Sequence, residues 1–287
     1  MLDLMLGSGR GGFSTGELFG LYWPTEFHHL NPVCSCGNRD CNIWNKRRSR
    51  GSRGIYSDLF SEFSQINYIV DSSKSLTWIA HQSRLLARQG IEAGYVLIWK
   101  NPEDFAKSCI KRGRYKNWHN RWVQYHRGYF HHVGECYTIQ INDLLNNFDR
   151  EMSRLCGAFE IPYDESMREY WNKEHHVLFG SATARLKLHQ PGSRAYEEAK
   201  KSSRRWDIRG EAQRASKIDG IEIPEKNRLV IDHILSFLRE NGLKKTDHVP
   251  VRSAFDFYRS FVKLGSRRSY FFFRRKLSPK RISIANH

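Results

Sequence analysis

The sequence predicts an α/β fold with a mainly parallel sheet flanked by helices. Four short apolar runs have the length and composition of buried strands: 2–6, 68–70, 95–99 and 137–141. Six longer segments have apolar residues at helical spacing: 76–89, 102–112, 118–130, 148–159, 165–171 and 229–241. Strands that alternate with helices are typical of βαβ units, in which neighbouring strands run parallel.

The boundaries of these elements come from local signals. The first apolar run, Leu2–Leu6, stops at the glycine-rich stretch Gly7–Gly12, so we interpret it as a buried strand followed by a tight turn. A serine caps the helix that begins at Leu76, and Pro102 occupies the first turn of another. Since ligands of parallel sheets bind beyond the carboxyl ends of the strands, polar residues that follow a strand are candidate site residues.

Length, charge and composition bound the class of protein. The 287 residues are enough for one large core, and we expect a single domain over 1–245 followed by a basic, aromatic extension over 246–287. Lys and Arg number 47 against 30 Asp and Glu, a net charge of +17 that attracts anions. No apolar run approaches the length of a membrane span, and the first residues lack a secretory signal, so we expect a cytoplasmic protein.

The stretch Gly7–Ser14 has the spacing of a phosphate loop. Phe13 stands where a nucleotide triphosphatase needs lysine. Backbone N–H groups and Arg10 can bind an oxyanion there. A phosphoryl group needs lysine and a metal ion to balance its charge. A sulfuryl group carries one negative charge fewer, so a loop without lysine could bind it with no metal. The alternative is that these glycines only form a turn.

Two further polar segments follow predicted strands. Asp71-Ser72-Ser73-Lys74 combines an acid, two hydroxyls and a cation, and is also compatible with a simple helix cap. Lys100 ends the third strand, and Ser108 follows eight residues later in the next helix, so that both can contact one phosphate. The alternative for Ser108 is an exposed helical serine.

The order of these pieces resembles the sulfotransferases that use 3′-phosphoadenosine 5′-phosphosulfate (PAPS), in particular their bacterial-type members. Asp71–Lys74 is similar to one of their motifs, and so are the segments 34–44, 161–164 and 175–181. The resemblance covers roughly residues 1–210. It implies the P-loop nucleoside triphosphate hydrolase-like sulfotransferase fold.

The resemblance also implies roles for individual residues. The 5′-phosphosulfate would contact Gly9, Arg10, Gly11, Gly12, Phe13 and Ser14. Arg10 would in addition stabilise the charge that develops on the bridging oxygen. Lys100 and Ser108 would bind the 3′-phosphate, and Arg185 would be a late cofactor contact.

The catalytic base is expected in or after the segment Thr15-Gly16-Glu17. In the family a helix separates the phosphate loop from a Gly-Glu pair whose glutamate can deprotonate the acceptor, whereas here the pair follows the loop at once. Glu17 ranks first as the base, His28 or His29 second and Glu26 third, because a base must reach its proton before its pKa matters.

The cysteines Cys34, Cys36 and Cys41 have spacing that is compatible with a metal site, which His28 or His29 could complete. Local disulfides or loop packing are the alternatives. Because no second Cys-x-x-Cys pair is present, we predict no metal site.

We therefore predict sulfuryl transfer from PAPS to a hydroxyl or amine of an unidentified acceptor, for example a glycan or lipid. One alternative is a degenerate, non-catalytic sulfotransferase-like binder of nucleotide or polyanion. A second is a basic nucleic-acid-binding protein that uses 112–127 and 267–281, although no nucleic-acid module is present. A third is a kinase with Asp71 as magnesium ligand, against which Phe13 argues. Peripheral membrane contact and oligomeric state are left open.

Overall fold

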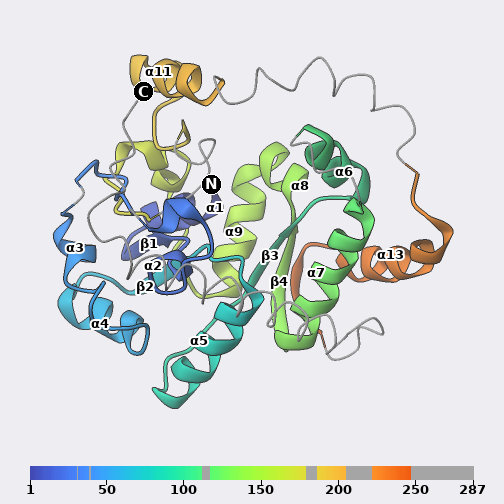
Figure 1. Ribbon diagram of the computed structural model, residues 1–287, viewed down its shortest axis with the longest axis horizontal. Helices are drawn as coiled ribbons and strands as arrows, with labels where there is room; N and C mark the ends of the chain where they lie inside the picture. Colours follow the sequence, from blue (N-terminus) through green and yellow to red (C-terminus); the bar gives the residue numbers. More distant parts are fainter. Residues whose placement is uncertain (31, 39, 112–116, 179–185, 205–221, 247–287) are drawn as a thin grey trace. The chain divides into compact units, whose positions relative to one another are not determined.

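The computed structural model describes residues 1–287 except residues 31, 39, 112–116, 179–185, 205–221 and 247–287 (Figure 1). The described residues fall into two compact units. The first comprises residues 1–85 and 164–196, and the second comprises residues 86–163 and 197–246. All but the first residue of the expected extension 246–287 lies outside the described residues, and the single domain over 1–245 stays a prediction.

A parallel pair of strands forms the centre of the first unit. Strand β1 (Gly12–Gly16) pairs with β2 (Tyr68–Asp71), with Gly12 opposite Tyr68. On its other side Gly16 forms a parallel bridge with Leu178, and Leu178 forms an antiparallel bridge with Cys34. Backbone pairing therefore continues beyond β1 to two segments that are distant in sequence.

Short helices surround this pair. The helices that lie wholly or mainly in the first unit are α1 (Leu2–Ser8), α2 (Phe19–Tyr22), η1 (Phe27–His29), α3 (Asn42–Asn45), α4 (Ile55–Glu62), α5 (Leu76–Arg88), η2 (Glu165–Met167) and η3 (Tyr170–Asn172). Helix α1 packs on β1 and β2. The fully buried apolar side chains of the first unit include Leu18, Leu59 and Trp78.

The second unit is built on a three-stranded sheet. Strand β4 (Glu135–Gln140) lies between β3 (Val96–Trp99), to which it is parallel, and β5 (Gly242–Lys245), to which it is antiparallel. Its helices are α6 (Pro102–Lys111), α7 (Trp118–His132), α8 (Ile141–Asn146), α9 (Phe148–Ala158) and α13 (Glu225–Leu238). Helix α11 (Arg194–Arg204) begins in the first unit and ends in this one. Figure 1 shows α9 on one side of the sheet and α7 with α13 on the other.

The predicted mixed α/β class is confirmed. The strands expected at 68–70, 95–99 and 137–141 are present as β2, β3 and β4. Helices α5, α6, α7, α9 and α13 fall within a few residues of their predicted ranges, except that residue 112 lies outside the described part. The parallel pairing is also present, but it is divided between two small sheets.

The prediction of a strand at Leu2–Leu6 is wrong, because these residues lie in helix α1, and the strand is the glycine-containing segment 12–16. Every apolar residue of the run is buried, and a short run that is buried all round has no periodicity to separate helix from strand. The helix predicted at 165–171 is instead two 3-10 turns, η2 and η3.

Within the described ranges, no helix combines the length and the apolar composition that crossing a bilayer requires.

Candidate functional site

The glycine-rich turn has the opposite polarity to a phosphate loop. A phosphate loop runs from a strand into a helix N-terminus, whereas this turn runs from the C-terminus of α1 into β1. Two of its N–H groups are used locally, since Gly9 N–H donates to Leu6 O at 3.2 Å and Gly12 N–H to Gly9 O at 2.9 Å. The Lys173 ammonium donates to the carbonyl oxygens of Gly7 and Gly12 at 2.9 and 3.1 Å. The turn thus presents carbonyl oxygens to a cation.

Close packing explains why these positions are glycine. A Cβ on Gly7 would stand 2.6 Å from the Ser14 Cβ, and a Cβ on Gly12 would stand 2.5 Å from Leu6 O. Arg10 is exposed and lies on this turn, at the amino end of β1. Hydrogen bonds from Ser166 lower the pKa of the nearby Asp164 carboxyl, and the Arg10 charge lowers it further. The expected phosphosulfate contacts of Gly9–Ser14 therefore lack the strand-to-helix geometry on which they were based.

Polar side chains from both parallel strands meet at the opposite end, the carboxyl end of β1 and β2. We name this group the first edge and define it as Glu17, Asp71, Ser73 and Lys74. Glu17 Oε1 accepts a hydrogen bond from Lys74 Nζ at 2.5 Å. The side chain of Lys74 is 73% exposed and that of Glu17 is 20% exposed, so this ion pair faces solvent.

Asp71 is the member of the first edge that accepts hydrogen bonds from several of the groups around it. Its Oδ1 accepts from Ser73 Oγ at 2.5 Å and Ser73 N at 2.9 Å. Its Oδ2 accepts from Tyr56 OH at 2.6 Å and Trp78 Nε1 at 2.8 Å. Ser73 Oγ in turn accepts from Phe19 N at 3.0 Å. Burial raises the pKa of Asp71, although these hydrogen bonds act against that rise.

The two neighbouring histidines differ in environment. His28 is exposed and lies beside Glu26, with 3.5 Å between Nδ1 and Oε2. His29 is buried, accepts a hydrogen bond from Thr25 N at 3.1 Å and packs edge-on against Phe19. Burial, with a smaller contribution from His28, lowers the pKa of His29 to about 4. Because its Nδ1 is already occupied, His29 fits a structural role better than that of a base.

The residues expected at the 3′-phosphate lie at the carboxyl end of β3, in the second unit. Lys100 is exposed, and its carbonyl accepts from Trp122 Nε1 at 3.0 Å. Asn101 Oδ1 accepts from Asp104 N at 2.8 Å and so caps helix α6, on which Ser108 is partly buried. Arg185 lies outside the described residues.

Sequence reasoning missed a second polar network, around Glu151 on α9. This carboxylate is fully buried and accepts from Arg150 Nε at 3.0 Å and from Asn241 Nδ2 at 3.1 Å. Asn241 Oδ1 also accepts from Gln140 N, at the carboxyl end of β4. No sequence signal joins residues about 100 positions apart, and only the pairing of β5 with β4 brings them together.

The three clustered cysteines lie close to a histidine, and that histidine is His176 rather than His28 or His29. One ligand atom from each of Cys34, Cys36, Cys41 and His176 lies within 4.8 Å of the others. All three cysteines are free thiols, and burial raises the pKa of Cys34. The pairing of Leu178 with Cys34 brings His176 here, across a separation that spacing alone does not reveal.

No family model, curated protein or solved structure matches the chain. The resemblance to PAPS-dependent sulfotransferases therefore stays a prediction from the residues, and the functional proposal rests on the geometry of the first edge.

Proposed function

We propose that the protein is a PAPS-dependent sulfotransferase in which Glu17 is the catalytic base. The observation that carries this proposal is the convergence of Thr15-Gly16-Glu17 with Asp71–Lys74 at the carboxyl ends of two parallel strands, where α/β proteins bind ligands. The finer fold, that of the P-loop sulfotransferases, belongs to the same proposal.

In the proposed reaction Glu17 takes the proton of an acceptor hydroxyl, whose oxygen attacks the sulfur of PAPS. The bond from sulfur to the bridging oxygen breaks, and 3′-phosphoadenosine 5′-phosphate leaves with the electron pair. The exposed ammonium of Lys74 is free to move from Glu17 to the sulfuryl oxygens as charge develops on them. An amine acceptor reacts in the same way through its nitrogen.

The hydrogen bonds around Asp71 support a role for this residue in positioning Glu17. Five donors surround this carboxylate: Leu18 N, Ser73 N, Ser73 Oγ, Tyr56 OH and Trp78 Nε1. With both oxygens engaged, Asp71 is poorly placed to hold magnesium, which argues against the kinase alternative. The network instead fixes the amides of Leu18 and Phe19, directly after Glu17.

One observation favours a second candidate, a binder of nucleotide or polyanion without turnover. The glycine turn presents carbonyl oxygens to Lys173, so Gly9–Ser14 offer a 5′-phosphosulfate no strand-to-helix loop. In this case Lys100 and other exposed basic residues would bind anions, and Glu17 at the first edge would not act as a base. The two candidates agree on anion binding and differ on transfer.

Thermal unfolding of the full chain tests ligand class. We expect 3′-phosphoadenosine 5′-phosphate to raise the midpoint, because a ligand at about 100 times its Kd adds about 2.7 kcal/mol to native-state stability. ATP with magnesium and single-stranded RNA are the comparison arms. A shift with RNA alone would overturn both candidates in favour of nucleic-acid binding, and a shift with ATP and magnesium alone would favour a kinase.

A matched pair of variants locates the 3′-phosphate. Lys100→Ala is expected to weaken binding of 3′-phosphoadenosine 5′-phosphate about 10- to 100-fold, because a hydrogen bond to a charged group contributes about 1.5–3 kcal/mol. Lys107→Ala removes an equally exposed charge from helix α6 and is expected to change binding little. Calorimetric titration measures both, and equal losses would assign the effect to general surface charge.

A further inference from the structure

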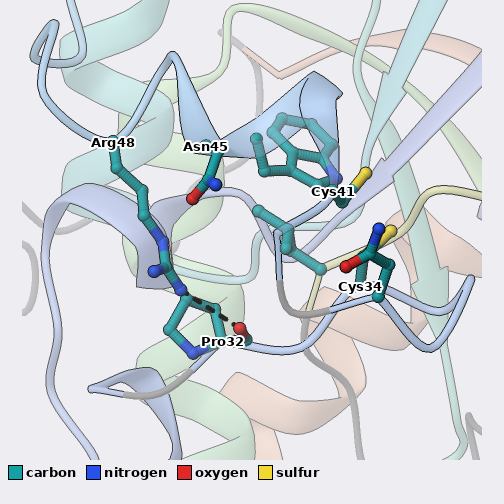
Figure 2. A pocket seen from close by; sticks show the side chains of 8 residues that line it. Pro32, Cys34, Cys41, Asn45 and Arg48 are labelled. Carbon is teal, nitrogen blue, oxygen red and sulfur yellow. Dashed lines mark hydrogen bonds between the residues drawn. The ribbon is translucent and has the colours of Figure 1, made fainter.

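The strongest unassigned feature outside the first edge is the group of Cys34, Cys36, Cys41 and His176, named here the Cys3His cluster. Three sulfur atoms and one imidazole nitrogen converge from two segments that lie more than 130 residues apart in sequence. Figure 2 shows Cys34 and Cys41 side by side, with their sulfur atoms on the same side of a small pocket. Four protein ligands of this type are what closed, structural zinc sites use.

Two of the ligand–ligand distances match those of a tetrahedral zinc site. The Sγ atoms of Cys34 and Cys41 lie 3.6 and 3.5 Å from Nδ1 of His176. Bond lengths of about 2.3 Å for Zn–S and about 2.05 Å for Zn–N, at the tetrahedral angle, give an S···N separation of about 3.55 Å. The His176 nitrogen and these two sulfur atoms therefore have the separation that a tetrahedral zinc ion requires.

A carboxylate lies near the second nitrogen of His176, beyond hydrogen-bond distance. This nitrogen, Nε2, lies 3.7 Å from Oε1 of Glu174. Metal-ligating histidines commonly donate their other ring N–H to a carboxylate, which fixes the tautomer and orients the ring. The Glu174 carboxylate would thus leave Nδ1 as the nitrogen that faces the three sulfurs.

The backbone holds the ligands in place independently of any ion. Gly37, with φ of 80°, closes a turn in which its N–H donates to Cys34 O at 2.9 Å. Val177 N–H donates to Ser35 Oγ at 2.9 Å, and Trp44 Nε1 donates to His176 O at 2.8 Å. Hydrogen bonds from both segments therefore bring the ligands together before a metal binds.

We propose that the Cys3His cluster binds one structural zinc ion, which fastens the 34–41 loop to the 176–178 segment. Leu178 exchanges backbone hydrogen bonds with β1, since its N–H donates to Thr15 O and its carbonyl accepts from Glu17 N, each at 3.0 Å. The ion thus stabilises the backbone on which Glu17 sits. This inference does not rest on the proposed sulfotransferase activity.

Metal content and coordination test the proposal directly. The full chain, purified without chelator and passed through gel filtration, is expected to contain about one zinc per molecule by mass spectrometry. X-ray absorption at the zinc edge should show three sulfur neighbours at about 2.3 Å and one nitrogen at about 2.0–2.1 Å. A zinc content near zero after addition of zinc salt, or a shell of oxygen and nitrogen only, would overturn the proposal. So would a disulfide between two of the three cysteines in the freshly purified protein.

Variants identify the ligands. Cys36→Ser and His176→Gln are each expected to lower zinc affinity at least 10-fold in a competition titration with a colorimetric chelator. The matched controls Cys156→Ser and His28→Gln remove the same chemical groups elsewhere and are expected to keep full affinity. Loss of zinc in His28→Gln but not in His176→Gln would contradict the assignment of the fourth ligand. If a ligand variant does not fold, the absorption spectrum of the wild-type protein still decides.

Discussion

Asp71 in the first unit and Glu151 in the second are both hydrogen-bonded carboxylates near the carboxyl end of a parallel strand pair, but their donors differ. Asp71 accepts only from neutral groups, among them Tyr56 and Trp78. Glu151 accepts from the guanidinium of Arg150, with Arg154 3.8 Å away, and from Asn241. The Asp71 carboxylate therefore has hydrogen-bond donors but no cation, whereas the Glu151 carboxylate has two arginines nearby.

This difference separates the network that we propose to position Glu17 from the network around Glu151, which connects secondary-structure elements. Around Glu151 the exposed arginines balance the charge locally, and the network ties α9 to the end of β5. Around Asp71 the donors are rigid aromatic and backbone groups that align the amides after Glu17. At the first edge a partly exposed carboxylate, Glu17, lies beside an exposed cation, Lys74.

Removal of the carboxylate charge should have the largest effect, and a different effect in the two networks. Asp71→Asn is expected to destabilise the protein by about 3 kcal/mol, because an amide N–H₂ would face the Trp78 N–H and leave buried donors unsatisfied. Glu151→Gln is expected to cost about 1 kcal/mol or less, since the arginines can turn to solvent. Urea unfolding measures both values. Equal costs would show that the two networks do not differ in kind.

Glycine substitutions should have opposite effects on stability in the two units. Gly16→Ala is expected to destabilise by about 2 kcal/mol or more, because φ is +68° and the new Cβ would meet Leu178 O at 2.4 Å. Gly157→Ala, on an exposed position of α9 with no atom near the new Cβ, should stabilise by about 0.5–1 kcal/mol. Thermal unfolding of both variants gives the contrast in sign. A neutral Gly16→Ala would mean that Leu178 does not pair with β1.

Buried histidines in both units predict that the folded protein loses stability in acid. Burial lowers the pKa of His29 and of His126 to about 4. An unfolded histidine takes its proton near pH 6.5, so this contribution to stability is present above about pH 6.5 and is lost as the pH falls toward about 4. The His126 ring packs against Trp122 at a tilt of 35°. His126→Phe should reduce the decrease in unfolding midpoint between pH 7 and pH 4.5.

The exposed His233 on α13 provides the matched control for loss of an imidazole. An unchanged acid dependence in His126→Phe would mean that the His126 ring is protonated or accessible in the folded state.

The sequence predicted most of the helices and strands whose apolar residues are regularly spaced or whose ends carry a capping residue. Helix α5 and the strands after 68 and 95 have clear boundary signals, and their positions are confirmed. The segment 2–16 is the main failure, because a buried apolar run followed by glycines fits both strand–turn–helix and helix–turn–strand. The glycines reflect close packing of α1 on β1, which no local pattern separates from phosphate binding.

The site was predictable only where its residues follow strands. Glu17 and Lys74 meet because the carboxyl ends of β1 and β2 lie together. The sequence indicated a strand end for Asp71–Lys74, but it placed the strand before Glu17 at Leu2–Leu6. His176 could not be matched to the cysteines, because the bridge between Leu178 and Cys34 is a long-range pairing. The Asn241 to Glu151 contact depends on β5, a short strand with no sequence signal of its own.

The proposed function depends most on Glu17 acting as the catalytic base at the first edge. Transfer of ³⁵S-labelled sulfate from PAPS to a mixture of hydroxylated acceptors tests it, with wild type, Glu17→Gln, His28→Gln and Glu26→Gln compared at equal stability. We predict transfer by the wild type, a loss of about 100-fold or more in Glu17→Gln, and retention in the other two. Label on the acceptors at the wild-type rate in Glu17→Gln, or no transfer by the wild type, would contradict it.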